Sequence, residues 1–265
     1  SIEVERLGRR LDIPRARDEL SELARTFNRM LDRLQEGFRQ EQRFVSDASH
    51  ELRTPLTVIL GYSDMLSRWG REDKNILDEG ITAIRSEAEN MQQLIEKLLF
   101  LARADQKRQA VNKEAVEFSE LLADTMEKMQ TVTTSHEVTL GRNDHAVVSA
   151  DPVLLRQLLR IFLENSVKYT PPGGHIHAYS ILSDDGKTIT VTLTDNGIGI
   201  APEHQARIFD RFYRVDSSRT KETGGSGLGL SIARWIAERH DIKIALRSAV
   251  DEGTTITLSI PTITE

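Results

Sequence analysis

One histidine, His50, stands among residues that could support acid–base or nucleophilic chemistry, in the stretch 44–56 (FVSDASHELRTPL). Glu51 follows it directly, and Thr54, four residues on, shares its face of a helix. Apolar residues at helical spacing form a stripe that we expect to be buried: Val45, Ala48, Leu52, Leu56 and Ile59. At about 100° per residue, His50 lies about 200° around the helix from Ala48 and from Leu52, so its imidazole is expected to face away from the stripe. A lone histidine here would by default be a solvated surface residue, but its neighbours favour a chemical role.

Two clusters in the second half of the chain combine groups that can handle a nucleotide. The first is 164–169 (ENSVKY), where Asn165 offers a carbonyl oxygen suited to Mg²⁺ and Lys168 offers positive charge to phosphate. The second is 195–199 (DNGIG), where the carboxylate of Asp195 can accept from an exocyclic amine. Glycines 197 and 199 let backbone approach a ligand closely.

Two further clusters follow in the same half. Residues 209–214 (FDRFYR) mix aromatic and basic side chains, and residues 224–230 (GGSGLGL) are a glycine run that opens a helix. Such a run presents backbone amides and a helix N-terminus to phosphate. Each cluster alone is a weak signal, because glycine-rich turns before helices are common. The order and spacing of all four, downstream of an exposed histidine, are much harder to obtain by chance.

Composition limits the class of protein that carries these clusters. The 265 residues suffice for one large or two ordinary domains, with 38% hydrophobic and 29% charged residues, the balance of a soluble protein. The net charge of -6 and pI near 5.7 give no overall footprint for nucleic acid. Without cysteine, disulfides and thiolate metal sites are excluded. We expect neither a membrane span nor a signal peptide within the chain.

The first half must position His50 on helices. From Asp18 a coiled-coil-like seam runs into the helix of His50: Leu20, Leu23, Phe27, Met30 or Leu31, Leu34 and Phe38. This seam is either a route for a signal or a simple dimerisation stalk. The helix is predicted to end near Gly70, and a second one to cover 74–104. Since a lone hairpin cannot cover both apolar stripes, we expect a dimeric four-helix bundle, with 107–113 as the linker that follows it.

The second half alternates between helix and strand patterns. We predict helices and strands at 118–129 (helix), 137–140 and 145–149 (strands), 152–168 (helix), 176–182 and 188–194 (strands paired around a turn at 184–186), 229–239 (helix), and 243–248 and 254–260 (strands). Strands in one layer with three helices on the other side make an α+β sandwich.

Taken together, these stretches resemble the sensor histidine kinases of two-component signalling over nearly the whole chain. Residues 44–56 resemble the H-box, 164–169 the N-box, 195–199 the G1 box, 209–214 the F-box and 225–230 the G2 box, and 11–34 resemble the end of a HAMP module. The resemblance implies three domains: 1–36 as the C-terminal part of HAMP and a stalk, 37–108 as the dimerisation and phosphotransfer hairpin, and 109–265 as a catalytic domain of the Bergerat (GHKL) ATP-binding fold.

The resemblance also implies roles for single residues. His50 would take the γ-phosphoryl group of ATP and pass it to an aspartate of a response regulator, with Glu51 as base and Thr54 placing a water for dephosphorylation of that regulator. The ATP site would comprise Asn165, Lys168, Tyr169, Asp195, Gly197, Gly199, Arg214, Gly225, Gly227, Leu228 and Gly229. Of these, Asn165 would hold Mg²⁺, and Asp195 would read adenine. Arg214, with Arg219 or Lys221, would stabilise charge on the transferred group.

Two positions depart from the family pattern. Ile161 stands where the family usually has a second asparagine, four residues before Asn165, which leaves open a pseudokinase that binds ATP and acts as a signalling scaffold. Hydrolysing relatives of this ATP fold have a glutamate there, so isoleucine argues against an ATPase. The second departure is His240-Asp241-Ile242, where the family commonly has glycines; we expect only a changed turn.

The resemblance further implies how the chain works in the cell. It would be the cytoplasmic part of a bacterial inner or plasma membrane protein, anchored through an upstream segment. Its partners would be a second copy of itself and the receiver domain of a response regulator, and its cofactors would be ATP and Mg²⁺.

Overall fold

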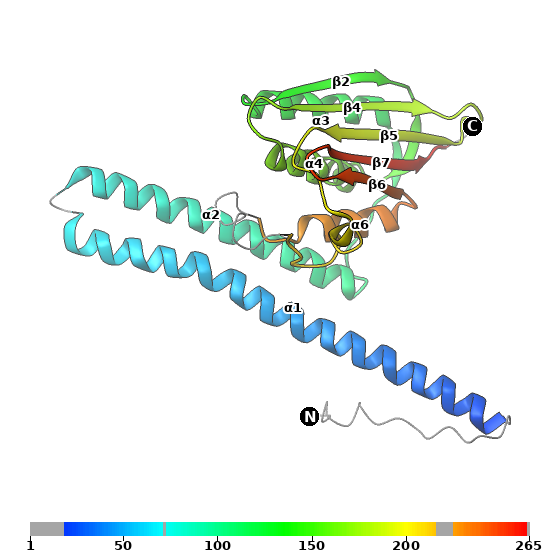
Figure 1. Cartoon of the computed structure of the whole chain (residues 1–265), viewed down its shortest axis with the longest axis horizontal. Helices are drawn as coiled ribbons and strands as arrows, with labels where there is room; N and C mark the ends of the chain where they lie inside the picture. The colour runs from blue at the N-terminus through cyan, green and yellow to red at the C-terminus, as the bar shows by residue number, and fades with distance from the viewer. Residues whose placement is uncertain (1–18, 71–72, 216–224, 264–265) are drawn as a thin grey trace. The chain divides into compact units, whose positions relative to one another are not determined.

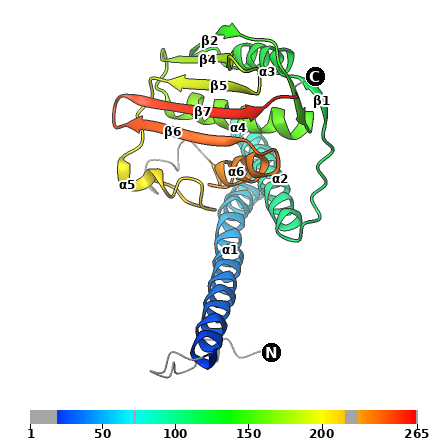
Figure 2. The same cartoon turned by 90° about the vertical axis from the view of Figure 1, so that its right-hand side faces the viewer.

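The computed structural model describes residues 19–70, 73–215 and 225–263, and the chain divides into two compact units whose boundary falls between Met91 and Gln92. Figures 1 and 2 label most of the helices and strands of both units. No helix among the described residues is long and apolar enough to cross a membrane. Residues 1–18 of the predicted HAMP-like start lie outside the described residues, as do Arg219 and Lys221.

The first unit consists of α1 (Glu19–Trp69) and the greater part of α2 (Lys74–Asp105). As predicted, α1 runs unbroken from the seam into the stretch around His50, and it continues through Pro55. The predicted burial of the apolar stripe is wrong for the single chain, because Val45 and Leu56 are 56% and 46% exposed. The physical reason is that two helices cover only one side of each other, which leaves the rest of each stripe in solvent.

The second unit contains a five-stranded sheet with the order β2-β4-β5-β7-β6. The strands are β2 (Glu137–Asn143), β4 (His175–Leu182), β5 (Thr188–Asp195), β6 (Lys243–Ala249) and β7 (Gly253–Pro261). β2 pairs with β4 in parallel and the other pairs are antiparallel. The predicted strands and the turn at 184–186 are confirmed to within a few residues, and Gly186 takes a positive φ of 68° in that turn.

Three helices cover one face of this sheet, as Figures 1 and 2 show: α3 (Phe118–Val132), α4 (Pro152–Tyr169) and α6 (Gly229–Arg239). The alternating apolar residues of β5 point into the layer between sheet and helices, where Ile189, Val191 and Leu193 are at most 1% exposed. α4 meets them with an apolar face that includes Leu155 and Leu159, both fully buried. The α+β sandwich is therefore confirmed.

One predicted strand belongs to a different sheet. The segment expected at 145–149 is β3 (Val147–Ala150), and it pairs with β1 (Glu114–Glu117) in a separate two-stranded sheet. β1 was not predicted, because four residues with two glutamates give too short an alternation to register as a strand. A short helix, α5 (Pro202–Gln205), was also missed.

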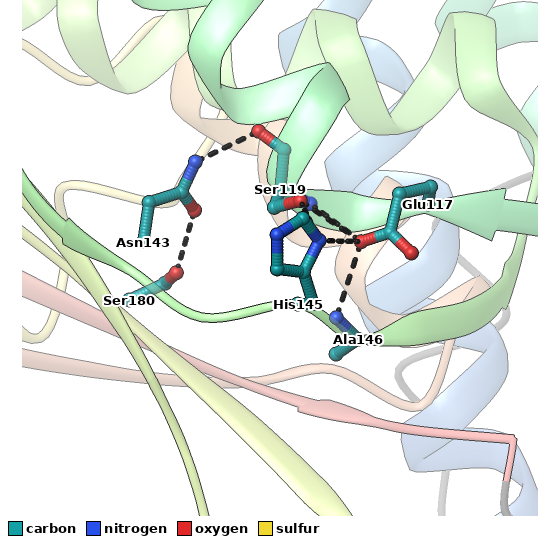
Figure 3. A network of polar contacts seen from close by, with 6 residues as sticks. All are labelled: Glu117, Ser119, Asn143, His145, Ala146 and Ser180. Atoms are coloured by element: carbon teal, nitrogen blue, oxygen red, sulfur yellow. Dashed lines mark hydrogen bonds and ion pairs between the residues drawn. The ribbon is translucent and has the colours of Figure 1, made fainter.

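A polar network attaches this small sheet to the rest of the unit (Figure 3). A carboxylate oxygen of Glu117 accepts from the hydroxyl of Ser119 at 2.9 Å and from the backbone N–H of Ala146 at 3.2 Å, and it lies 3.7 Å from Nδ1 of His145. Burial opposes ionisation, but these hydrogen bonds outweigh it and hold the pKa of Glu117 below its ordinary value. Asn143 donates to the carbonyl of Ser119 at 2.8 Å, and so joins β2 to the start of α3.

Candidate functional site

A cavity of about 730 Å³ lies in the second unit, beside the C-terminal half of α4. Seven residues of the predicted ATP site line it: Asn165, Lys168, Tyr169, Arg214, Gly225, Gly227 and Gly229. They come from three segments that are far apart in sequence. The volume is in the range of small-molecule sites, which is about 300–1,000 Å³.

The helix α4 presents its polar residues to this cavity because its opposite face is buried. Leu155, Leu159 and Leu163 are fully buried on that other face. Asn165 and Lys168 are consequently left at the cavity wall, where Lys168 Nζ also lies 4.9 Å above the ring of Tyr169. The side chain of Asp151 caps the start of α4 by accepting from the backbone N–H groups of Val153 and Leu154, which fixes the helix at its other end.

The charges that line the cavity favour an anion. The cationic side chains are Lys97, Arg160, Lys168 and Arg214, and the anionic ones are Glu96 and Glu164. Arg160 pairs with Glu164 at 3.1 Å, so part of that charge is already balanced. Burial lowers the pKa of Lys97, with smaller opposed contributions from Glu164, which raises it, and from Arg160 and Lys168, which lower it. A bound polyanion would relieve the unfavourable confinement of these cations.

Asp195 ends β5 and is only 7% exposed. One carboxylate oxygen accepts from the hydroxyl of Ser166 at 2.8 Å, and the other accepts from the backbone N–H groups of Gly197 at 3.0 Å and Thr254 at 3.2 Å. Burial raises the pKa of Asp195, and these hydrogen bonds oppose that rise. The carboxylate is thereby held in one orientation, next to Gly197, whose Cα lies too close to the carbonyl of Tyr169 for any side chain.

Gly253 explains how the chain closes around Asp195. It has a φ of +89°, and a Cβ at this position would collide with the carbonyl oxygen of Asp195. Gly199 has a comparable close approach to the backbone of Ala249 on β6. Both contacts allow the loop after β5 to fold back on the edge of the sheet.

Three buried polar atoms near this site have no hydrogen-bond partner among the described residues: Thr170 Oγ1, Arg214 Nε and Ser226 Oγ. Arg214 and Ser226 line the cavity, and Thr170 Oγ1 adjoins Gly197 beside Asp195. Buried polar groups are normally satisfied, so such atoms indicate places where a polar ligand fits. The positions agree with phosphates in the cavity and a base beside Asp195.

The donor set also fits Mg²⁺ in the way expected for a nucleotide-bound ion. Asn165 offers one amide oxygen at the cavity, and the described residues contain no cluster of three His, Cys, Asp or Glu that could hold a metal ion alone. Mg²⁺ often takes one or two protein ligands and completes its shell with phosphate oxygens and water.

The glycine loop before α6 is hydrogen-bonded to the F-box segment. Phe212 has a positive φ of 59°, and its N–H donates to the carbonyl of Gly227 at 3.0 Å. Leu228 is fully buried at the start of α6, so it serves the core and does not line the cavity. Ile161 lines the cavity at 9% exposure and would meet a side chain at Gly229 at 3.4 Å.

His50, Glu51 and Thr54 lie in the first unit, on α1. His50 is exposed, as predicted. Thr54 shares its face, and the Thr54 hydroxyl is directed to the carbonyl of His50 at 3.4 Å. Within the described residues, no hydrogen bond joins the imidazole of His50 to Glu51, as expected for successive residues on a helix.

Sequence reasoning missed three residues of the site. Ser166 orients Asp195, Ser226 lines the cavity and has a buried hydroxyl without a partner, and Lys97 lines the cavity from α2. Ser166 and Ser226 lie inside the clusters that were singled out, so the motifs themselves could have drawn attention to them. Lys97 lies in an amphipathic stripe pattern that carries no such signal.

Comparison with known proteins places this geometry in a family. Three family models match: the HAMP domain over residues 1–36, the His Kinase A (phospho-acceptor) domain over 40–107, and the histidine kinase-, DNA gyrase B- and HSP90-like ATPase over 150–264. The chain belongs to the sensor histidine kinases. The order of its three matched domains is the one that the boxes predicted.

Two curated relatives extend the similarity along the chain. The sensor histidine kinase YkoH of Bacillus subtilis (strain 168) is 38% identical over 241 residues, which are 91% of this chain and 52% of that protein. The histidine-protein kinase ArlS of Staphylococcus aureus (strain USA300) is 35% identical over 257 residues, which are 96% of this chain and 56% of that protein. The chain thus spans about half the length of these relatives.

Among solved structures, the histidine kinase AdeS of Acinetobacter baumannii matches with a TM-score of 0.63 at 20% identity, and covers 81% of this chain and 98% of its own. Full-length ShkA in complex with AMPPNP matches with a TM-score of 0.62 at 23% identity, over 84% of this chain and 46% of its own. At these identities the likeness shows the fold.

Proposed function

We propose that this chain is the kinase part of a sensor histidine kinase that phosphorylates its own His50 from Mg-ATP and passes the phosphoryl group to an aspartate of a response regulator. The observation that carries the proposal is the cavity of the second unit. It gathers Asn165, Lys168, Arg214 and the glycine loop at the start of α6 around a net positive space. Asp195 is outside the lining and is joined to the same helix, α4, through Ser166.

The residues of this chain would divide the work as follows. Asp195 accepts from the exocyclic amine of adenine, and Lys168 with Arg214 holds the phosphates. Asn165 would hold Mg²⁺, which when bound neutralises charge on the phosphates. In the transfer, a nitrogen of His50 forms a bond to the γ-phosphorus, the bond from that phosphorus to the β-γ bridging oxygen breaks, and ADP leaves. Glu51 would take the imidazole proton, and Thr54 would place the water that hydrolyses the aspartyl phosphate of the response regulator.

Two units must meet for this reaction, because the acceptor is on α1 and the nucleotide site is in the second unit. We propose that the irregular segment 107–113, which follows α2 inside the second unit, serves as the hinge between α2 and the nucleotide-binding part, and Lys107 within it has a positive φ of 55°. The domain limits 1–36, 37–108 and 109–265 belong to the same proposal.

The exposed apolar side chains of α1 support a homodimer. Phe27, Leu34, Val45 and Leu56 are 42% to 56% exposed in the single chain. A second copy that packs its own α1 and α2 against them would form a four-helix bundle and remove this apolar surface from water. We further propose that the full-length protein is attached to the membrane upstream of the HAMP module, with this part in the cytoplasm.

A labelling experiment tests the kinase proposal. The chain is incubated with γ-³²P-ATP and Mg²⁺, alongside His50→Gln and Asn165→Ala, and the label is tested for acid lability and base stability. We expect a label of that type that is lost in both variants. His175→Gln, an exposed histidine paired with Glu137 on the sheet, is the matched control and should keep the label.

Two other results would replace the proposal. Nucleotide binding without any label would indicate a signalling scaffold, the function that Ile161 favours because it takes the place of the second asparagine in the cavity wall. Steady phosphate release that does not depend on His50 would indicate an ATPase.

A further inference from the structure

His240 is one of the seven histidines of the chain and is buried, at 3% exposure, at the end of α6. Its Nε2 accepts from the backbone N–H of Asp151 at 3.0 Å, and its Nδ1 lies 2.8 Å from the carbonyl of Ile236. A backbone N–H can only donate and a carbonyl can only accept. The imidazole is therefore neutral, with its proton on Nδ1. The expectation of a mere changed turn at this position is wrong, because His240 makes a buried cross-link.

Three segments that are distant in sequence meet at this histidine. Asp151 is the cap of α4, and its second carboxylate oxygen accepts from the backbone N–H of Asn112 at 2.9 Å. Lys113 of the same linker lies 3.7 Å from the carboxylate of Asp241, which follows His240. The cluster thus ties the linker, the start of α4 and the end of α6 together.

The same two helices build the nucleotide cavity at their other ends. α4 carries Asn165 and Lys168 near its C-terminus, and α6 begins at Gly229 of the glycine loop. Since packed helices move as rigid bodies, their relative placement at the cavity depends on how they are joined at the His240 end.

From this geometry we propose that His240 is a positioning residue for the nucleotide site that works only as the neutral imidazole, so that nucleotide binding weakens in the acid range. The proposal rests on the proposed function, because it concerns the same cavity. Protonation would place a second N–H on Nε2 directly against the N–H of Asp151. Two donors would then face each other, and the link from α6 to the cap of α4 would be lost.

The charged groups around His240 set the direction of the effect. Burial lowers its pKa, and Lys113 of the linker lowers it too, while the carbonyl of Ile236, Asp151 before α4 and Asp241 after α6 raise it. The net shift is downward. The folded chain therefore binds fewer protons here than the unfolded chain does. The stabilisation is complete above the ordinary imidazole value of about 6.5 and is lost as the pH falls through the lower folded value.

The test compares the wild-type chain with His240→Gln, because glutamine keeps one acceptor and one donor but does not titrate. Three quantities are followed from about pH 5.5 to about pH 8: the imidazole ¹⁵N shifts, the unfolding equilibrium in denaturant and the dissociation constant of Mg-ADP. His240→Leu removes both hydrogen bonds, so this variant should bind Mg-ADP weakly at every pH. His175→Gln serves as the control for an exposed histidine.

We expect the ¹⁵N shifts to show a neutral ring protonated at Nδ1 at pH near 7. Below about pH 6.5, the unfolding constant of the wild type should rise up to about tenfold per pH unit more than that of His240→Gln. As the pH falls across this range, the dissociation constant of Mg-ADP should rise about fivefold more for the wild type than for His240→Gln. Equal pH profiles for wild type and His240→Gln, or a ring protonated at Nε2, would overturn the positioning role. Absence of nucleotide binding at any pH, with the expected ring state, would instead overturn the proposed function.

Discussion

A substitution of Asp195 can test folding and ligand recognition separately. Asp195→Asn keeps the shape of the side chain, and the amide oxygen can still accept from the N–H groups of Gly197 and Thr254. The amide nitrogen then faces Ser166, whose hydroxyl can rotate from donor to acceptor. The hydrogen bonds that hold the loop are therefore preserved in number.

Stability should accordingly change little at neutral pH. Burial raises the pKa of Asp195, so the folded state favours the neutral acid more than the unfolded state does. Ionisation of Asp195 therefore lowers the stability of the wild type as the pH rises from the ordinary aspartate pKa through the pKa in the folded state. The asparagine variant has no such cost. We expect its thermal midpoint at pH 7 to equal or exceed that of the wild type, and this advantage to shrink as the pH falls towards the ordinary aspartate value.

Nucleotide binding should respond in the opposite way. A hydrogen bond from the adenine amine to a charged acceptor contributes about 1.5–3 kcal/mol, which corresponds to roughly 10- to 150-fold in affinity. Replacing the acceptor oxygen with an amide donor removes that bond. Isothermal titration with Mg-ADP should therefore show a dissociation constant raised by about 10-fold or more.

The control is Asp185→Asn, the same chemical change at an exposed turn between β4 and β5, where the carboxylate accepts from Ser183 and from the N–H of Lys187. Affinity there should be unchanged. If Asp195→Asn binds Mg-ADP as tightly as the wild type while remaining folded, Asp195 does not read the base. If it unfolds, the reasoning on its hydrogen bonds is wrong.

Two further predictions concern residues that shape the same site. Ile161→Asn should lower the free energy of unfolding by about 1–3 kcal/mol, because it places an amide in the buried wall of the cavity. The same variant should raise the rate of His50 phosphorylation, and Ile161→Val is the control for side-chain size. An unchanged rate in Ile161→Asn would remove the argument that Ile161 weakens the kinase. Gly253→Ala should lower the thermal midpoint by at least about 3 °C, since its positive φ and the nearby carbonyl of Asp195 both oppose a side chain. Gly186→Ala, with a φ of +68° but open space around it, isolates the cost of φ, so equal losses in the two variants would show that the carbonyl contact is unimportant.

Local patterns predicted most of the fold. The helices were found because their apolar residues repeat over several turns, and α6 was placed at 229–239 without error. The pairs of strands around 184–186 were found because a turn signal separates two alternating runs. β1 escaped because it is stabilised by pairing with β3 and by the hydrogen bonds of Glu117, which are contacts between distant residues.

The site shows the same division between local and distant information. Three of the five boxes located Asn165, Lys168, Arg214 and the glycine loop, and the structure brings these together at one cavity. The partners of Asp195 come from α4 and β7, and the partner of His240 precedes α4, 89 residues earlier. No spacing rule links such positions, because tertiary packing alone makes them neighbours.

The unbroken course of α1 has a consequence for how a stimulus could reach His50. Apolar residues recur every seven positions along the helix: Ala24, Leu31, Phe38, Val45, Leu52 and Ile59. This apolar stripe therefore keeps one side of the helix from the seam to the phosphoacceptor, and His50 lies on the opposite side of the helix. Removing one residue between Phe38 and Val45 would turn His50 by about 100° relative to the seam, whereas removing seven would turn it by only about 20°. Rotation about the helix axis, rather than displacement along it, is therefore what this helix can pass from the seam to His50.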